Sequence, residues 1–283
     1  MMDMANKKLI KKILGCVFLM ASVQTLSAQS YQELVKSGLD AVATDSLLQA
    51  ENYFRQALKK EPALKSNALL FHYVGQIQEK TGRDAEALES YQMGINLSPH
   101  TMGILLSRAA LYMRTGVLDK ALTDYCDVLD LNKDHRHALM MRAYIYTTQH
   151  LYKQARADYE HLLHLDGNNE DAVLGLVLLN DKDNRPKEAM DQINLLIQKN
   201  PQRAEFYAVR AEMEVNRKAF ESAEVDFKKA IDLDPENITY YINRAQYYIQ
   251  TKQRSAARAD LKKARSLGAD AGELADLYQK IED

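Results

Sequence analysis

Few residues of this chain are of a type and spacing that could do chemistry, and the histidines are the first to consider. Five of the seven histidines lie between His135 and His164. His161 and His164 are three residues apart, a spacing that can place two metal ligands on one face of a helix. His150 is expected at the opposite end of the helix hairpin. His137 is expected on the groove side rather than the convex side. We therefore expect solvated surface histidines and no metal site.

A second chemical pattern is an arginine followed sixteen residues later by an aspartate. The pairs are Arg108 with Asp124, Arg142 with Asp158, Arg210 with Asp226, and Arg244 with Asp260. Where the repeated pattern lacks the arginine it also lacks the aspartate. We interpret the residues as structural ion pairs between two neighbouring helices, near the core. A row of ligand-binding arginines is the alternative, and the matching aspartates disfavour it.

The sequence contains no signature of catalysis or of nucleic acid binding. It has no glycine-rich phosphate loop, no nucleophile elbow and no zinc-protease motif. The formal charge of the 283 residues is −2, and the first 28 residues, with four lysines and one aspartate, contribute +3 of it. The remaining −5 does not suit a surface that binds phosphates. We expect a protein that is not an enzyme, has no cofactor and has no nucleic acid partner.

The elements that position these residues follow a fixed period. Alanine returns after one step of 37 residues and then five steps of 34, at Ala50, Ala87, Ala121, Ala155, Ala189, Ala223 and Ala257. A small residue usually precedes each alanine by twelve positions, with Val177 as the exception, and a large apolar residue follows it by four. This spacing suits two antiparallel helices whose axes approach closely at the small residues. Each helix hairpin leaves an apolar face that the next hairpin covers.

The pattern resembles that of the tetratricopeptide repeat family over residues 31–271. The resemblance implies an all-α fold, a right-handed superhelical solenoid of seven helix–turn–helix units within residues 29–271. The units are expected at residues 31–64, 68–101, 102–135, 136–169, 170–203, 204–237 and 238–271. In residues 272–283, Leu274, Leu277 and Ile281 fall at helical spacing. They predict a C-terminal capping helix that covers the last unit.

Residues 1–28 are typical of a secretory signal peptide. Lysines precede an apolar run from Ile13 to about Leu26, and Ser27 and Ala28 are small residues before Gln29. The run is about 14 residues long, shorter than the roughly 18 of a membrane-spanning helix. We expect export, cleavage after Ala28 and a periplasmic location, with association with the outer membrane as an alternative. A small residue is usual at the position of Leu26, so an uncleaved anchor also stays open.

In tetratricopeptide repeats the first helices of successive units line a concave groove that binds peptides. Carried over to this sequence, the resemblance places an unusually apolar set of side chains on the groove of the middle units. They are Leu106, Met113, Met140, Met141, Tyr144, Leu174 and Leu178. Contiguous exposed apolar surface usually marks a binding site, and methionine adapts to varied partners. The alternative is that tight curvature or a second copy of the chain buries these residues.

These features together predict the function and the kind of partner. We expect a non-enzymatic protein–protein interaction adaptor of the bacterial cell envelope, which binds a peptide or helix of another protein in its groove. The alternative is a permanent structural subunit of an outer-membrane, secretion or cell-wall assembly. After signal cleavage the chain is expected to have no membrane span. The identity of the partner and the oligomeric state stay open.

Overall fold

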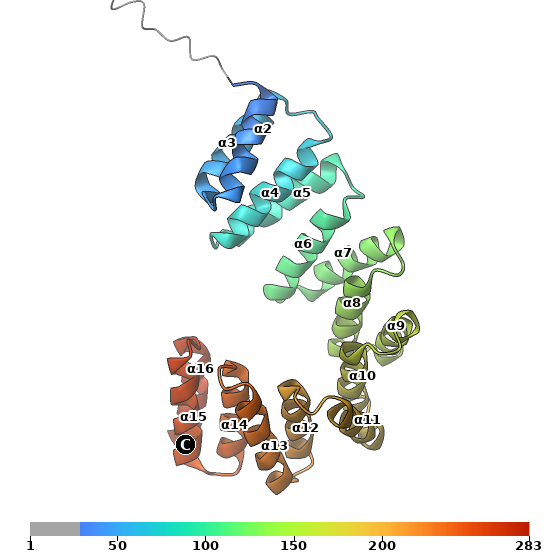
Figure 1. Ribbon diagram of the computed structural model, residues 1–283, viewed down its shortest axis with the longest axis vertical. Coiled ribbons are helices and arrows are strands. Elements are labelled where there is room, and N and C mark those ends of the chain that lie inside the picture. Colours follow the sequence, from blue (N-terminus) through green and yellow to red (C-terminus); the bar gives the residue numbers. More distant parts are fainter. Residues whose placement is uncertain (1–28, 283) are drawn as a thin grey trace, which may run out of the picture. The chain divides into compact units, whose positions relative to one another are not determined.

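The computed structural model describes residues 29–282, and every regular element in that range is an α-helix (Figure 1). Sequence neighbours among these helices pack together as antiparallel pairs. The predicted all-α fold of helix–turn–helix units is thereby confirmed. The proposed signal peptide, residues 1–28, lies outside the described residues.

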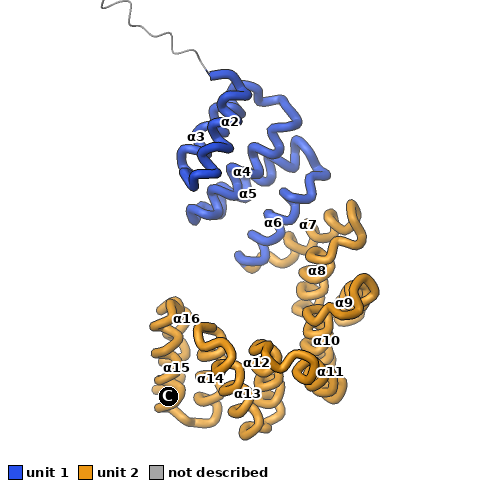
Figure 2. The backbone as a smooth tube through the Cα atoms, viewed as in Figure 1, with its two compact units in different colours: residues 1–115 blue, residues 116–283 orange. Residues whose placement is uncertain are grey.

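The chain forms two compact units that meet in the sequence between Thr115 and Gly116 (Figure 2). The first unit contains two complete hairpins, in which α2 packs on α3 and α4 packs on α5. It ends with α6, which packs on α5. The helices of this unit are α2 (Tyr31–Ala43), α3 (Leu47–Lys60), α4 (Asn67–Lys80), α5 (Asp84–Leu97) and α6 (Met102–Arg114).

The second unit begins with α7, which packs on α8, and continues with four complete hairpins and a final helix. Its helices are α7 (Leu118–Leu131), α8 (Arg136–Thr148), α9 (Tyr152–Leu165), α10 (Glu170–Lys182), α11 (Pro186–Lys199), α12 (Ala204–Asn216), α13 (Phe220–Leu233), α14 (Ile238–Gln250), α15 (Arg254–Ser266) and α16 (Ala271–Glu282). The predicted capping helix is α16. Its Leu274, Leu277 and Ile281 are buried in one cluster with Leu261 of α15, so the last hairpin has its apolar face covered.

The turn between the two helices of each predicted repeat has one residue with a positive φ, and hairpins are numbered below by their repeat. These residues are Asp45, Gly82, Gly116, His150, Asn184, Lys218 and Lys252. In the fourth hairpin, for example, the Leu151 N–H donates to the Tyr146 carbonyl, and the chain reverses through His150 at φ 61°. Glycine adopts this left-handed conformation without cost and asparagine and aspartate tolerate it, whereas other residues lose about 1–2 kcal/mol. The chain therefore has local strain at the turns of His150, Lys218 and Lys252.

Close approach of the two helices in a hairpin depends on the small residue predicted from the sequence. A Cβ added to Gly75 would lie 2.7 Å from Cδ1 of the buried Tyr91, so the aromatic ring fills the space that the glycine leaves. Gly38 and Phe54 are related in the same way. In the fifth hairpin the exception, Val177, is fully buried in one cluster with Ile193, which stands where the other hairpins often have an aromatic residue. A larger residue on one helix is thus matched by a smaller one on the other.

Candidate partner-binding site

The arginines of the recurring Arg–Asp pattern bind carboxylates inside the second unit. Arg142 donates from Nε and Nη2 to the two carboxylate oxygens of Asp158, both at 2.8 Å. Asp158 belongs to the second helix of the same hairpin, and its side chain is only 7% exposed. These bidentate, charge-assisted bonds occupy the guanidinium groups. A guanidinium held in this way is not free to bind a ligand.

Two further pairs of the pattern have the same geometry. Arg210 donates to Asp226 at 2.6 and 2.8 Å, and Arg244 donates to Asp260 at 2.7 and 2.8 Å. Arg108 lies in the first unit and Asp124 in the second, so their pairing stays a prediction. The three pairs within the second unit therefore join the two helices of their hairpins.

Some of these arginines also bind the preceding hairpin, which sequence reasoning did not predict. Arg210 Nη1 donates to Asn194 Oδ1 at 2.7 Å, and Arg108 Nη1 donates to Gln92 Oε1 at 2.6 Å. Arg142 Nη1 lies 3.7 Å from Cys126 Sγ. Each of these partners stands sixteen residues before its arginine, and that spacing is the signal that could have revealed them. One guanidinium thus links two hairpins as well as two helices.

Two of the three hairpins without the arginine have a different polar link at the same level. In the second hairpin the buried Gln78 side chain and the Ser90 hydroxyl are hydrogen-bonded at 2.7 Å. In the fifth, Asn180 Nδ2 donates to Gln192 Oε1 at 2.9 Å. Ser90 and Gln192 occupy the position of the missing aspartate. The structure therefore joins the two helices near the core even where the sequence pattern is interrupted.

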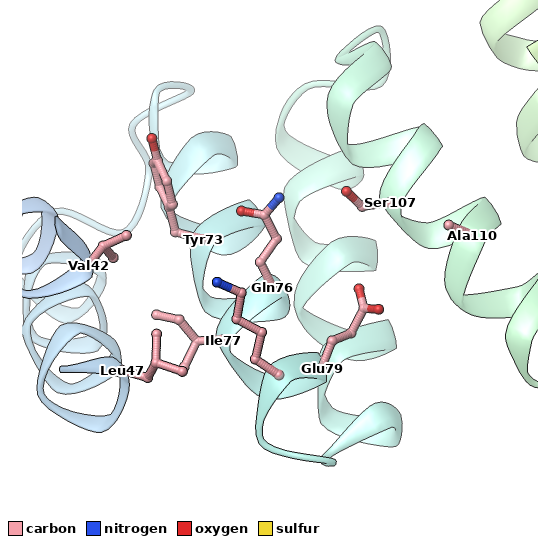
Figure 3. Close-up of a pocket in the computed structure, with 9 residues that line it drawn as sticks. Val42, Leu47, Tyr73, Gln76, Ile77, Glu79, Ser107 and Ala110 are labelled. Atoms are coloured by element: carbon pink, nitrogen blue, oxygen red, sulfur yellow. The ribbon is translucent and has the colours of Figure 1, made fainter. Parts of the chain in front are cut away.

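The first unit has an apolar hollow on its first helices, with a volume of about 380 Å³. We call it the apolar hollow; it is lined by Val42, Leu47, Tyr73, Gln76, Ile77, Glu79, Lys80, Ser107 and Ala110. Figure 3 shows Val42, Leu47 and Ile77 on one side and Ser107 and Ala110 of α6 on the other. Hollows that are largely apolar, with a few polar groups at fixed positions, are typical of binding sites.

The carboxylate of Glu79, which lines the hollow, is held by other side chains. The Tyr91 hydroxyl donates to Glu79 Oε1, and Arg114 Nη2 donates to Glu79 Oε2 at 3.4 Å. Arg114 also binds Asp84 at 2.7 Å, an interaction that lowers the pKa of that carboxyl. The ring of Tyr73 stacks on the buried Phe54 with centroids 5.4 Å apart. The hollow is therefore preformed, and its carboxylate is already paired with an arginine.

The predicted groove residues are divided between the two units. Leu106 and Met113 lie on α6 of the first unit and are partly exposed. Met140 and Met141 are partly exposed on α8 of the second unit. Tyr144 on α8 is 51% exposed and Leu178 on α10 is 37% exposed, so both can meet a partner. The continuity of the strip from one unit to the other stays a prediction.

Leu174 requires a correction, because it belongs to the core rather than to a binding surface. Its side chain is 5% exposed and lies in one cluster with Ile193 of α11 and with Phe206 and Met213 of α12. The following hairpin therefore covers it. The repeat position of Leu174 is the same as that of the partly exposed Met140. Position within the repeat alone does not decide exposure.

Family comparison agrees with this construction in both units. Residues 35–100, 146–213 and 238–267 match three family models that are each described as tetratricopeptide repeat. The three matches together cover more than half of the chain. The chain belongs to the tetratricopeptide repeat family. Repeats of this kind stack into arrays with extended surfaces that bind other proteins.

Several solved structures have the same fold as this tetratricopeptide repeat chain. A tetratricopeptide repeat protein from Parabacteroides merdae ATCC 43184 is 29% identical, with a TM-score of 0.84 over 90% of this chain and 100% of that one. The pilF protein of Pseudomonas aeruginosa is 16% identical, with a TM-score of 0.54 over 76% and 97% of the two chains. Yeast Tom70 is 15% identical, with a TM-score of 0.57 over 92% and 65%. The last two likenesses concern the fold alone.

Sequence reasoning missed the apolar hollow because it followed the methionine-rich middle repeats. The available signal was the repeat position of three residues that line the hollow. These residues are Tyr73, Gln76 and Glu79, which stand at the positions of Met141, Tyr144 and Met113 in the other repeats. Whether such side chains enclose a hollow depends on the packing of α2, α3, α4 and α6, which no single repeat specifies.

No group of three or more metal-ligating side chains is assembled anywhere in residues 29–282. His161 Nε2 instead lies 2.8 Å from Asp134 Oδ1, and His150 Nδ1 lies 2.7 Å from the Tyr152 hydroxyl. Over the same residues, each helix is too short or too polar to cross a membrane.

Proposed function

We propose that this protein is a non-enzymatic adaptor of the bacterial cell envelope that binds an apolar peptide segment or helix of another protein. The apolar hollow of the first unit carries this proposal. It is accessible, preformed and lined by side chains of four helices. An amphipathic helix or an extended segment would place its apolar side chains there.

The chemistry of the hollow favours an apolar ligand. Val42, Leu47, Tyr73 and Ile77 present carbon surface, and transfer of apolar surface out of water is the main driving force of such association. Glu79 is already bonded to Arg114 and to the Tyr91 hydroxyl. A ligand therefore gains little by bringing a cation to this place, and its apolar side chains should dominate the affinity.

The second unit has an exposed apolar surface of its own. Tyr144 on α8 and Leu178 on α10 are exposed on first helices, and α8 contacts α10. Large aromatic side chains frequently dominate binding energies at interfaces. We expect Tyr144 to be an anchor for the partner.

Location in the envelope rests on the sequence pattern of residues 1–28. Basic residues followed by an apolar run and small residues favour export and cleavage. The purified native protein should begin at Gln29 and fractionate with the periplasm. An intact mass that includes Met1 would contradict cleavage, and recovery in the cytosol would contradict the proposed location.

The binding role is tested by site-specific photo-crosslinking in cells. A photoreactive residue is placed at Gln76 in the apolar hollow, at Tyr144, and at Leu48 as a control. Leu48 is 69% exposed on α3 and does not line the hollow. We expect one discrete protein adduct from Gln76, and none from Leu48.

A charged variant then separates binding from folding. Ala110 is exposed and lines the hollow, so Ala110→Glu should place a carboxylate against the ligand and weaken capture, while Leu48→Glu should not. Circular dichroism should show unchanged helix content in both variants. Equal capture by wild type and Ala110→Glu, or equal adducts at Gln76 and Leu48, would refute binding in the hollow.

A further inference from the structure

The last two complete hairpins present a groove of a different chemical kind. The first helices α12 and α14 contact each other, and two hollows of about 280 and 400 Å³ lie along them. Glu212 of α12 and Asn243 of α14 line both hollows, so the hollows are neighbours on one surface. We call this surface the polar groove. It belongs entirely to the second unit.

Glu212 is a carboxylate without a countercharge. Asn243 Nδ2 donates to Glu212 Oε1, and in the described part of the chain no lysine, arginine or histidine forms an ion pair with Glu212 or lines either hollow. Glu212 is accessible from the groove. Partial desolvation by the surrounding helices raises the pKa of this carboxyl above its usual value, against the opposing effect of the Asn243 hydrogen bond.

The arginines closest in sequence cannot supply the missing charge, because other carboxylates hold them. Within α12 and α14 the cations are Arg210, bonded to Asp226, and Arg244, bonded to Asp260. At the two ends of α12, Arg217 pairs with Asp181 at 2.6 Å. Arg203 binds Glu170, Asp171 and Glu205. Each of these interactions fixes a guanidinium away from Glu212.

Amide side chains surround the carboxylate. Asn243, Gln246 and Gln250 follow one face of α14 at helical spacing, and Asn216 lies at the end of α12. In the described structure the side-chain amides of Gln246, Gln250 and Asn216 form no hydrogen bond to another residue. Each free amide offers both donors and an acceptor, as an extended peptide backbone requires. The groove thus combines unused hydrogen-bonding groups with one unpaired negative charge.

We propose that the polar groove binds a protein segment through a lysine or arginine side chain, which pairs with Glu212 while the surrounding amides bind the backbone of the segment. A cation in this position neutralises the carboxylate of Glu212, which has no ion-pair partner within the described range of the chain. Such charge-assisted hydrogen bonds are stronger than neutral ones. The site would select for charge, whereas the apolar hollow in the first unit would select for apolar side chains.

The test uses the full mature chain and short synthetic peptides with blocked ends, identical except for one central residue. That residue is lysine, its uncharged isostere norleucine, or glutamate. Affinities are measured by fluorescence anisotropy at low ionic strength, since exposed charge interactions are screened by salt. We expect the lysine peptide to bind about tenfold more tightly than the norleucine peptide. The glutamate peptide should bind more weakly than either.

Two variants assign the preference to the groove. Glu212→Gln should remove the preference for lysine over norleucine, and Gln246→Glu, which adds a second carboxylate, should increase it. Glu221→Gln is the matched control, because Glu221 is an exposed carboxylate on α13 that lines neither hollow. Thermal melting verifies that all variants are folded. If Glu212→Gln proves unstable, Gln246→Glu still decides.

The inference is wrong if lysine and norleucine peptides bind the wild type equally, or if neither binds at millimolar concentration. It is also wrong if Glu212→Gln keeps the preference for lysine. These results would leave the apolar hollow unaffected, since that hollow lies in the other unit and none of these substitutions touches it.

Discussion

The Arg210–Asp226 pair gives the sharpest test of how the hairpins are held together. Asp226 is 6% exposed and Arg210 is 23% exposed, and two hydrogen bonds of 2.6 and 2.8 Å join them. Arg210→Met keeps most of the apolar stem and removes the charge, so the aspartate stays buried without its cation. Asp226→Asn keeps the shape of the side chain, and the remaining arginine can reach water and its second partner, Asn194.

The two substitutions should therefore have unequal costs. Loss of one member of a buried pair typically costs about 3–5 kcal/mol, and the partial exposure of Arg210 places Arg210→Met near about 3 kcal/mol. The pKa of Glu214 is raised by burial and by the nearby negative charge of Asp226, and Arg210 opposes this rise. Removal of Arg210 therefore leaves both carboxylates without the positive charge that stabilises them. For Asp226→Asn we expect about 1–2 kcal/mol, the worth of a charge in a hydrogen bond.

Urea unfolding followed by circular dichroism measures both costs, provided that the slope of the transition is unchanged. The double variant should lose about 2 kcal/mol less than the sum of the single losses, because neither charge is then left alone. Arg258→Met is the control: Arg258 binds Glu282 at 2.6 Å, but both side chains are more than half exposed. That control should change stability by less than about 0.5 kcal/mol. Equal losses without coupling, or a loss from Arg210→Met no larger than that of the control, would refute this reasoning.

Three further substitutions test the turns, the helix packing and a buried carboxylate. Lys218→Gly should raise the urea midpoint, by about 1 kcal/mol in stability, because Lys218 has a φ of 61° that glycine adopts freely; no change would show that the turn is unstrained. Gly75→Ala should cost about 1–3 kcal/mol in thermal melts through overlap with Tyr91. The control Gly103→Ala has no neighbour closer than 3.4 Å to the new Cβ and should be neutral or stabilising; equal effects would contradict the packing argument. Glu214 has a buried oxygen without a partner in the described residues, and burial raises its pKa above the usual value of a glutamate. Glu214→Gln should therefore stabilise by about 1 kcal/mol at pH 7, and the gain should vanish as the pH falls to the usual pKa of a glutamate, because the folded protein takes up the proton first; a gain independent of pH would exclude ionisation as its cause.

The fold class was predictable because its determinants recur at a constant spacing. Small residues, aromatic residues and turns return with the same period, so each repeat confirms the interpretation of the others. The spacing of Leu274, Leu277 and Ile281 predicted the final helix in the same way. The division into two units after Thr115 was not predictable, because the 34-residue spacing of the repeats continues unchanged across it.

The candidate site was harder to predict, because exposure depends on neighbours rather than on repeat position. Leu174 and Met140 have equivalent positions, yet Leu174 is buried next to Phe206 and Met140 is partly exposed. The unpaired charge of Glu212 was equally invisible in the sequence. It depends on which carboxylates hold the four neighbouring arginines, and those partners lie up to 36 residues away.

Val177 and Ile193 restrict how this repeat can change during evolution. Both are completely buried in the same cluster, at the positions where the second hairpin has Gly75 and Tyr91. An aromatic residue introduced at position 193 alone would find its space taken by the valine, and glycine introduced at 177 alone would leave a void. A direct exchange of the two arrangements, one residue at a time, therefore passes through an intermediate that is less stable than either. Alanine at position 177, as at Ala211 and Ala245 of the later repeats, gives a more gradual route between them.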